Sequence, residues 1–286
     1  MASISHIQKI SDTYIHESFE MVTEDHDDHS FCGIMFDVSV SAKDLPVLAF
    51  QIEGVSVRGG FGHMSIWMTE NSWKGKHNRK TKWKMIYEKF HGPSRRKLQL
   101  LQLDDPVIMK DGESIGLYIH SLAQNDDSIV YDNQRGHADS HDDLITVSSG
   151  MAHLDFNPFG ESAPWGGSAW RLGRSFVGCI SYGVRYQLWT PEASPLFPSQ
   201  FRLASSAFCH VHAFSWSGLP LDIIKYVLNM CPPSWFDCPA ALGLKNKKNE
   251  GQSKYFISPF HALANWDDSP GNSSTVKYIR RCCNVT

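Results

Sequence analysis

The sequence predicts a mainly β protein, an antiparallel β-sandwich followed by a small α-helical segment. Three observations lead to this prediction. Between residues 31 and 188, apolar residues alternate with polar ones in short runs, which is typical of strands with one buried face. Clusters of glycine, proline, aspartate and asparagine separate the runs and indicate turns. Beyond residue 200 the apolar spacing becomes helical.

The strands are expected where the alternation is cleanest. In residues 34–40, isoleucine, phenylalanine and valine alternate with methionine, aspartate and serine. Residues 64–69 and 115–119 repeat the pattern, and residues 180–188 show it over five apolar positions. About eight such runs, separated by turns, favour a sandwich or barrel over alternating strand and helix units.

A domain boundary is expected where prolines accumulate. Pro191, Pro195 and Pro198 fall within eleven residues, and each lacks the backbone donor that a strand ladder needs. The predicted organisation is therefore an N-terminal extension at 1–29, the β-sandwich domain at 30–189, a proline-rich linker at 190–200 and a helical segment at 201–286.

The helical segment contains an amphipathic stripe and an internal repeat. The stripe comprises Ile223, Ile224, Val227, Leu228 and Cys231, and Pro232-Pro233 is expected to end its helix. A shift of 52 residues aligns identical residues in two stretches of this segment. The aligned pairs include Ser206 with Ser258, Phe208 with Phe260, Lys225 with Lys277, Tyr226 with Tyr278, and Cys231 with Cys283.

The second copy of this repeat resembles a known motif. Ser258-Pro259-Phe260-His261-Ala262 resembles the Thr-Pro-Leu-His-x-Ala opening of an ankyrin repeat, and residues 219–231 look like the second helix that follows. Ankyrin repeats run to about 33 residues, so the longer period indicates an insertion at residues 244–254. The resemblance implies a degenerate ankyrin-like segment of two copies, which must lean on the β domain or belong to a truncated array because about three repeats are usually needed for a continuous core.

The strand region also resembles a family. Residues 31–186 are similar in order and character to β-sandwich modules of the PHR-like or jelly-roll kind. The similarity covers the opening strand at 33–38, residues 66–69 followed by Trp83, residues 116–120 and the closing strand at 176–182. It implies a partner-binding module of the sort attached to ubiquitin-ligase or scaffold proteins, although no ligase element is visible in the chain.

Aromatic and arginine side chains in one loop are the preferred binding candidates. Trp165 and Trp170 lie in a glycine-rich stretch that continues into Arg171 and Arg174. Tryptophan beside arginine at the end of a sandwich is typical of anchors for partner recognition or of platforms for sugar rings. We therefore expect these four residues to form the binding site, with no catalytic residue among them.

Two clusters of histidine and aspartate have the composition of metal sites. The better candidate is His137, Asp139 and His141, and residues 25–29 form the other. Histidine and carboxylate are ligands for zinc or iron. Neither cluster falls on a predicted helix, so solvated loop residues are the favoured interpretation, and neither a metal nor a cofactor is predicted.

Composition and cysteine usage restrict the class of protein. Of 286 residues, 42% are hydrophobic and 20% charged, with a net charge of −3, as in folded globular proteins. The basic residues form no long uninterrupted run and no apolar stretch is clean enough to span a bilayer, so neither nucleic acid nor membrane is an expected partner. Seven cysteines without a Cys-x-x-Cys pair, and an N-terminus without a secretory core, predict reduced thiols and residence in the cytoplasm, with the nucleus as the alternative.

The predicted function is a non-catalytic intracellular adaptor that binds another protein through sandwich loops and helical repeats. One alternative is a carbohydrate-binding sandwich that uses Trp165 and Trp170. The other is a metal-dependent enzyme that uses His137, Asp139 and His141. The absence of a nucleophile elbow and of a phosphate loop from the sequence disfavours an enzyme.

Overall fold

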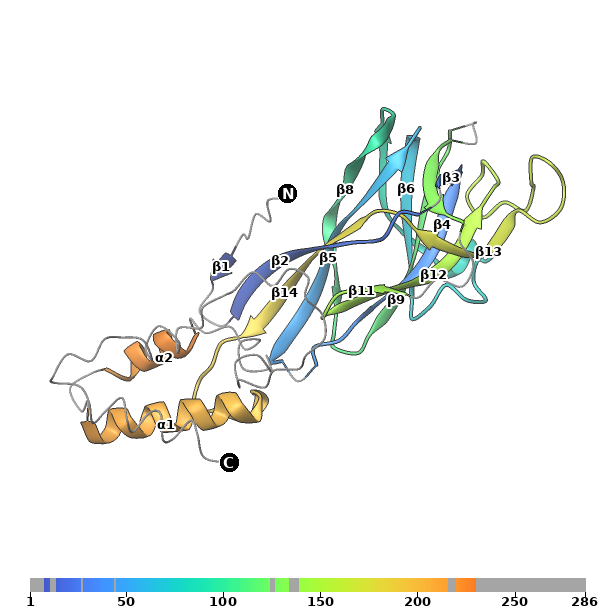
Figure 1. The fold of residues 1–286 in the computed structure, drawn as a ribbon. Helices are drawn as coiled ribbons and strands as arrows, with labels where there is room; N and C mark the ends of the chain where they lie inside the picture. Colours follow the sequence, from blue (N-terminus) through green and yellow to red (C-terminus); the bar gives the residue numbers. More distant parts are fainter. Residues whose placement is uncertain are drawn as a thin grey trace, which may run out of the picture. The chain divides into compact units, whose positions relative to one another are not determined.

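Two antiparallel sheets make up the β part of the chain, which confirms the predicted sandwich fold (Figure 1). The computed structural model describes residues 8–10, 14–26, 28–43, 45–123, 127–133, 139–215 and 220–229. The described residues up to 186, apart from 45–46, form one compact unit, and residues 45–46 and 187–229 belong to a second.

Among the described residues, the first sheet has five strands and the second has nine. In spatial order the first contains β1 (Gln8–Ile10), β2 (Tyr14–Val22), β14 (Cys179–Gln187), β5 (Val47–Gly59) and β8 (Ser94–Met109). The second contains β3 (Asp28–Phe31), β10 (Ile129–Asp132), β13 (Trp170–Phe176), β12 (Ile145–His153), β4 (Gly33–Val40), β9 (Ser114–Ser121), β6 (Gly62–Glu70) and β7 (Lys84–His91), and β11 (Ser140–His141) pairs with β12.

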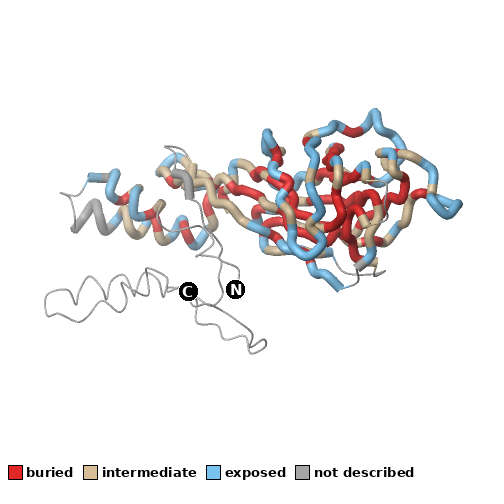
Figure 2. Tube along the Cα trace, turned by 90° about the horizontal axis from the view of Figure 1, so that it is seen from above, coloured by how far each residue is buried: buried red, intermediate tan, exposed pale blue. Residues whose placement is uncertain are grey.

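The central strands of the nine-stranded sheet bury the apolar positions that the alternation predicts. Ile34, Phe36 and Val38 of β4 are fully buried. Phe36 stacks on Phe176 of β13 with ring centroids 4.3 Å apart. Buried residues run along the strands through the middle of the β unit (Figure 2). These side chains form the predicted core of the sandwich.

The opposite face of the same sheet is buried as well, which the alternation does not predict. Met35 of β4 is fully buried and Asp37 nearly so. In register with Met35 lie Tyr118 of β9 and Met151 of β12, and Trp67 of β6 lies opposite Tyr118. These four side chains form a cluster with Trp73, Trp83 and Phe159, which come from loops. We call these seven residues the outer aromatic layer.

The β unit begins earlier than the predicted boundary at residue 30. Strand β2 falls within the predicted N-terminal extension, yet it lies next to β14 in the five-stranded sheet. Phe19 of β2 stacks on Tyr182 of β14 with centroids 5.4 Å apart, and Met21 is buried. Three consecutive polar residues, His16, Glu17 and Ser18, interrupt β2, so the strand lacks the sustained alternation by which the other strands are predicted.

The second unit is helical, as predicted. It contains the short 3-10 turn η2 (Ser194–Leu196), α1 (Ser199–Ser215) and α2 (Leu221–Asn229). Ile224 and Leu228 of the predicted stripe pack with Trp189, Phe197 and Phe201 in a small core. The predicted linker at 190–200 therefore takes part in this unit through Phe197.

The ankyrin-like motif at 258–262 and the second copy of the repeat lie outside the described residues. No described helix is both long enough and apolar enough to cross a membrane.

Candidate functional site

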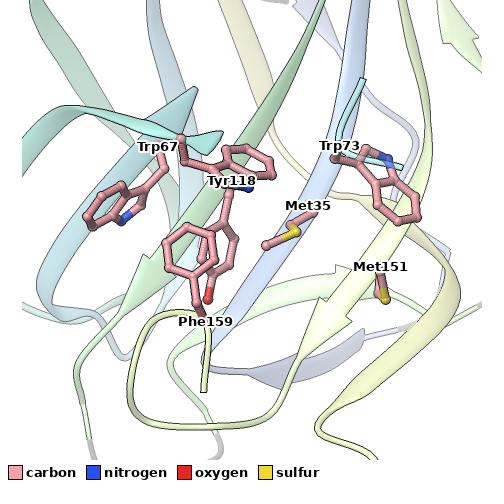
Figure 3. Close-up of a cluster of buried hydrophobic side chains, with 7 residues drawn as sticks. Met35, Trp67, Trp73, Tyr118, Met151 and Phe159 are labelled. Atoms are coloured by element: carbon pink, nitrogen blue, oxygen red, sulfur yellow. The ribbon is translucent and has the colours of Figure 1, made fainter. Parts of the chain in front are cut away.

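Two loops cover the outer aromatic layer: residues 71–83, here called the basic loop, and residues 154–169, the Trp165 loop. Phe159 of the Trp165 loop packs on the Tyr118 ring at 5.0 Å and edge-on against Trp67 at 5.2 Å (Figure 3). Its φ of 65° lies in the left-handed region, which a bulky residue rarely adopts. Packing over the sheet therefore holds this loop in a strained conformation.

The Asp155 carboxylate forms hydrogen bonds within the Trp165 loop and holds its shape. Asp155 accepts backbone hydrogen bonds from Asn157 and Ser162, each at 2.8 Å. Burial raises the pKa of Asp155, but these two N–H donors, together with His153 and the Asn157 side chain, lower it by a larger amount, so the net pKa is below its ordinary value. Gly160 lies so close that a Cβ there would collide with the Asp155 carboxylate. An ionised Asp155 therefore fixes the shape of the loop.

The basic loop is anchored in a similar way. Asp37 of β4 accepts hydrogen bonds from the Ser72 hydroxyl at 2.6 Å and from the Trp73 backbone N–H at 2.9 Å. The Trp83 indole N–H donates to the Lys76 carbonyl at 2.9 Å. Both tryptophans are buried, so the ends of the loop are fixed while its charged side chains remain outside.

Two buried histidines lie beneath these loops. The Tyr118 hydroxyl donates to His153 Nδ1 at 2.6 Å, and His153 Nε2 donates to the Gly160 carbonyl at 2.9 Å. His120 Nε2 donates to the Asp155 carbonyl at 3.0 Å. Burial lowers the pKa of His120 to about 3 and that of His153 to about 4. Both rings are therefore neutral near pH 7 and serve as fixed hydrogen-bonding groups that connect the sheet to the Trp165 loop.

The structure separates the four predicted binding residues. Trp165 is 65% exposed and contacts Phe31 edge-on at 5.5 Å. Trp170 is partly buried and stacks on His153 at 3.9 Å. Arg171 donates to the Ser168 carbonyl at 2.7 Å. Arg174 is only 7% exposed, and it donates to carbonyls of its own strand. Of the two predicted tryptophans, Trp165 is the one that projects outward.

The predicted metal cluster is divided between described and undescribed positions. Asp139 accepts hydrogen bonds from the Ser148 hydroxyl at 3.1 Å and the Ser149 backbone N–H at 3.2 Å. His141 is exposed on β11, and His137 lies outside the described residues. Among the residues that the structure describes, no group of three or more potential ligands is placed to hold a metal ion.

The other His/Asp cluster contacts neighbouring elements of the sandwich. His26 Nδ1 lies 3.3 Å from the buried Asp132 carboxylate of β10, and Asp25 accepts from Arg58 of β5 at 2.7 Å. These contacts connect residues 23–26, which follow β2, to strands of both sheets. The cluster is thus part of the sandwich framework.

Sequence reasoning overlooked a concentration of positive charge. Residues 74–97, here called the basic strip, contain ten of the 27 lysines and arginines and one acidic residue, Glu88. The longest run of consecutive basic residues in the strip is only three, Arg95-Arg96-Lys97, because tryptophan, glycine and polar residues separate most of the others. Counting charge in a window of this length would have found it.

Comparison with known proteins assigns the chain to no family. No protein-family model matches the chain, and a search of curated proteins finds no match.

Removing the Tyr118 hydroxyl tests whether the histidine network holds the site together. Tyr118→Phe is expected to destabilise the protein by about 1–3 kcal/mol, because His153 Nδ1 is then left buried without its donor. Urea unfolding followed by tryptophan fluorescence measures the change. Tyr226→Phe is the control, because Tyr226 is 64% exposed on α2; an equal effect of the two substitutions would contradict the assignment.

Proposed function

We propose that this chain is a non-catalytic adaptor that binds a partner protein through the Trp165 loop of its β-sandwich. The observation that supports this most directly is the large exposed indole of Trp165 on a loop that Asp155 and Phe159 hold in place. Tryptophan is enriched among residues that dominate binding energy at protein interfaces. A loop that is already ordered loses little conformational entropy on binding.

The surroundings of Trp165 have the character of an interface. Leu172, on the strand that follows the loop, is 68% exposed, so a second large apolar side chain is accessible. Arg171 adds a charged group at the start of the same strand. An apolar centre with a polar rim is the usual composition of a protein contact surface. The resemblance of the sandwich to PHR-like modules agrees with this proposal.

The state of the reactive side chains supports a non-catalytic function. His120 and His153 are neutral and already hydrogen-bonded to backbone carbonyls. Burial, with a contribution from Glu20, raises the pKa of the Cys179 thiol to about 11, which removes its nucleophilic thiolate at neutral pH. The three described cysteines, Cys32, Cys179 and Cys209, are in the reduced thiol form, in keeping with a cytoplasmic or nuclear adaptor.

The carbohydrate alternative relies on two tryptophan platforms. A sugar ring stacks on an open indole face, and His153 covers one face of Trp170. Trp165 alone retains the exposure that a platform needs. A single exposed indole can serve as an anchor in a protein interface, but it does not provide the two platforms on which the carbohydrate alternative relies. The protein-binding proposal is therefore preferred.

Affinity capture with the full chain tests the proposal. We expect Trp165→Ala to reduce the amount of captured partner protein at least about tenfold relative to the wild type. The affinity of each variant for the identified partner is then measured with purified components. Val22→Ala is the matched control, because Val22 is 63% exposed on β2 of the other sheet.

Three results would contradict the proposed function. Equal capture by Trp165→Ala and wild type would remove the loop from the interface. Quenching of tryptophan fluorescence by a soluble glycan would favour the carbohydrate alternative. Turnover of a small molecule by the purified chain would favour an enzyme.

A further inference from the structure

The basic strip carries a net positive charge, whereas the rest of the chain is net negative. Its ten basic residues and single acidic residue give 24 residues a net charge of +9. Because the whole chain carries −3, the other 262 residues carry −12. A net positive charge of this size attracts acidic ligands to the strip.

Most of this charge is exposed and uncompensated. Lys89 pairs with Asp104 at 2.7 Å, and Arg95 pairs with Asp127. Within the described part of the chain, the other eight basic side chains of the strip have no carboxylate partner, and all except Lys76 are exposed. An acidic partner therefore displaces few existing ion pairs when it binds here.

The central part of the strip is also held in position. Trp73 and Trp83 bury the two ends of the basic loop in the outer aromatic layer, and the short 3-10 turn η1 (Lys80–Lys82) lies just before Trp83. The Lys80 ammonium lies over the Trp67 ring, 5.1 Å from its centroid. Charges that are fixed before binding lose less entropy when a partner arrives.

The strip continues along a sheet edge. Strand β7 is the last strand of the nine-stranded sheet and pairs with β6 on its inner side. In the described part of the chain, no strand pairs with its other side, which leaves backbone N–H and C=O groups for a further strand. Lys84 and Lys89 lie on β7 together with Met85 and Phe90, which are 41% and 68% exposed.

We propose that an acidic, extended segment of a partner protein adds as a strand to the free edge of β7, with its carboxylates facing the lysines of the basic strip. Backbone hydrogen bonds and apolar contacts with Met85 and Phe90 would supply affinity, and the lysines would select for acidic sequence. The inference rests on the proposed function only in that the partner is a protein, since it uses a different surface from the Trp165 loop.

The observations favour a protein segment over other polyanions. Nucleic acid and lipid headgroups offer no backbone that can pair with a strand edge. The exposed Phe90 and Met85 between the charges also fit a polypeptide with alternating acidic and apolar side chains. In addition, the −12 charge of the remaining chain disfavours a long polyanion that extends beyond the strip.

The first test measures binding of a defined peptide to the full chain by fluorescence anisotropy. The probe is a labelled peptide with the eight residues of β7's length, in which glutamate alternates with threonine. We expect the double substitution Lys82→Glu, Lys84→Glu to weaken binding at least about tenfold, and added salt to weaken binding to the wild type. The matched control Lys43→Glu, Lys110→Glu reverses two exposed lysines outside the strip and is expected to change affinity less than about twofold.

The second test separates strand addition from simple charge attraction. A peptide in which proline replaces threonine keeps every carboxylate but cannot donate the backbone hydrogen bonds of a strand. We expect it to bind at least about tenfold more weakly than the first peptide. Trp165→Ala is expected to bind the glutamate–threonine peptide as the wild type does, so failure of the Trp165 interface and failure of this proposal give different results.

The proposal would be overturned by equal binding of the two peptides or by no detectable binding of either. It would also be overturned if charge reversal in the strip had no effect, or if a single-stranded oligonucleotide or anionic lipid vesicles bound more tightly than the peptide. Thermal unfolding of the Lys82→Glu, Lys84→Glu protein verifies that it is folded, which is expected because both side chains are exposed.

Discussion

Acidification from pH 6.5 to 5 is expected to lower the free energy of unfolding of the β unit by about 2 kcal/mol for each of the two buried histidines, His120 and His153. Burial is the main cause of both lowered pKa values, about 3 and about 4, against an ordinary value of 6.5. The unfolded chain therefore binds protons below pH 6.5 that the folded chain does not bind. Stability is greatest above pH 6.5 and decreases as the pH falls towards 4.

Two measurements verify this pH dependence. NMR of the imidazole signals is expected to show no titration of His120 and His153 above pH 5. Urea unfolding between pH 7.5 and 5 is expected to show a slope approaching 1.4 kcal/mol per pH unit from each histidine. His120→Gln should reduce this slope. A midpoint near pH 6.5 for either buried ring would contradict the prediction.

Gly150→Ala is expected to prevent the β unit from folding. Gly150 lies in β12 at an irregularity in its pairing with β4 and β13. A Cβ at this position would collide with the carbonyl oxygen of Met35 on β4. Because the obstacle is backbone in the middle of the nine-stranded sheet, it cannot move as a flexible side chain would. We expect a loss of more than about 4 kcal/mol.

Gly92→Ala is the matched control for this substitution. Gly92 lies in the β7–β8 connection, where an added Cβ has nothing within 4 Å, so its effect should stay within about 0.5 kcal/mol. Circular dichroism and thermal unfolding of both variants measure the difference. A Gly150→Ala protein that unfolds within 5 °C of the wild type would show that β12 and β4 can separate without loss of the fold.

The local pattern was sufficient to predict the class of fold. Alternation at 34–40 and 180–188 predicted strands that the structure contains as β4 and β14, and the stripe around Ile224 predicted α2. Each of these predictions uses only the pattern of residues that are close together in the sequence. Strand β2 was missed because its apolar positions are few and polar residues separate them.

The candidate site was predicted only in part, for a physical reason. Trp165 and Trp170 are five residues apart in a similar polar context, yet one is exposed and the other stacks on His153. What separates them is the register of β13 against β12, which places Trp170 opposite His153. Likewise, the charge of Arg174 suggested a surface position, but its guanidinium bonds to carbonyls of its own strand.

Periodicity and proline placement in the chain were enough to indicate two antiparallel sheets followed by helices, because strand and helix periods are local properties of a few residues. The burial of Met35 and Asp37, the neutral histidine network and the β7 edge beside the basic strip all required knowledge of which distant segments meet. Burial and pKa depend on that neighbourhood, since they are set by the loops that cover the outer face of the sheet.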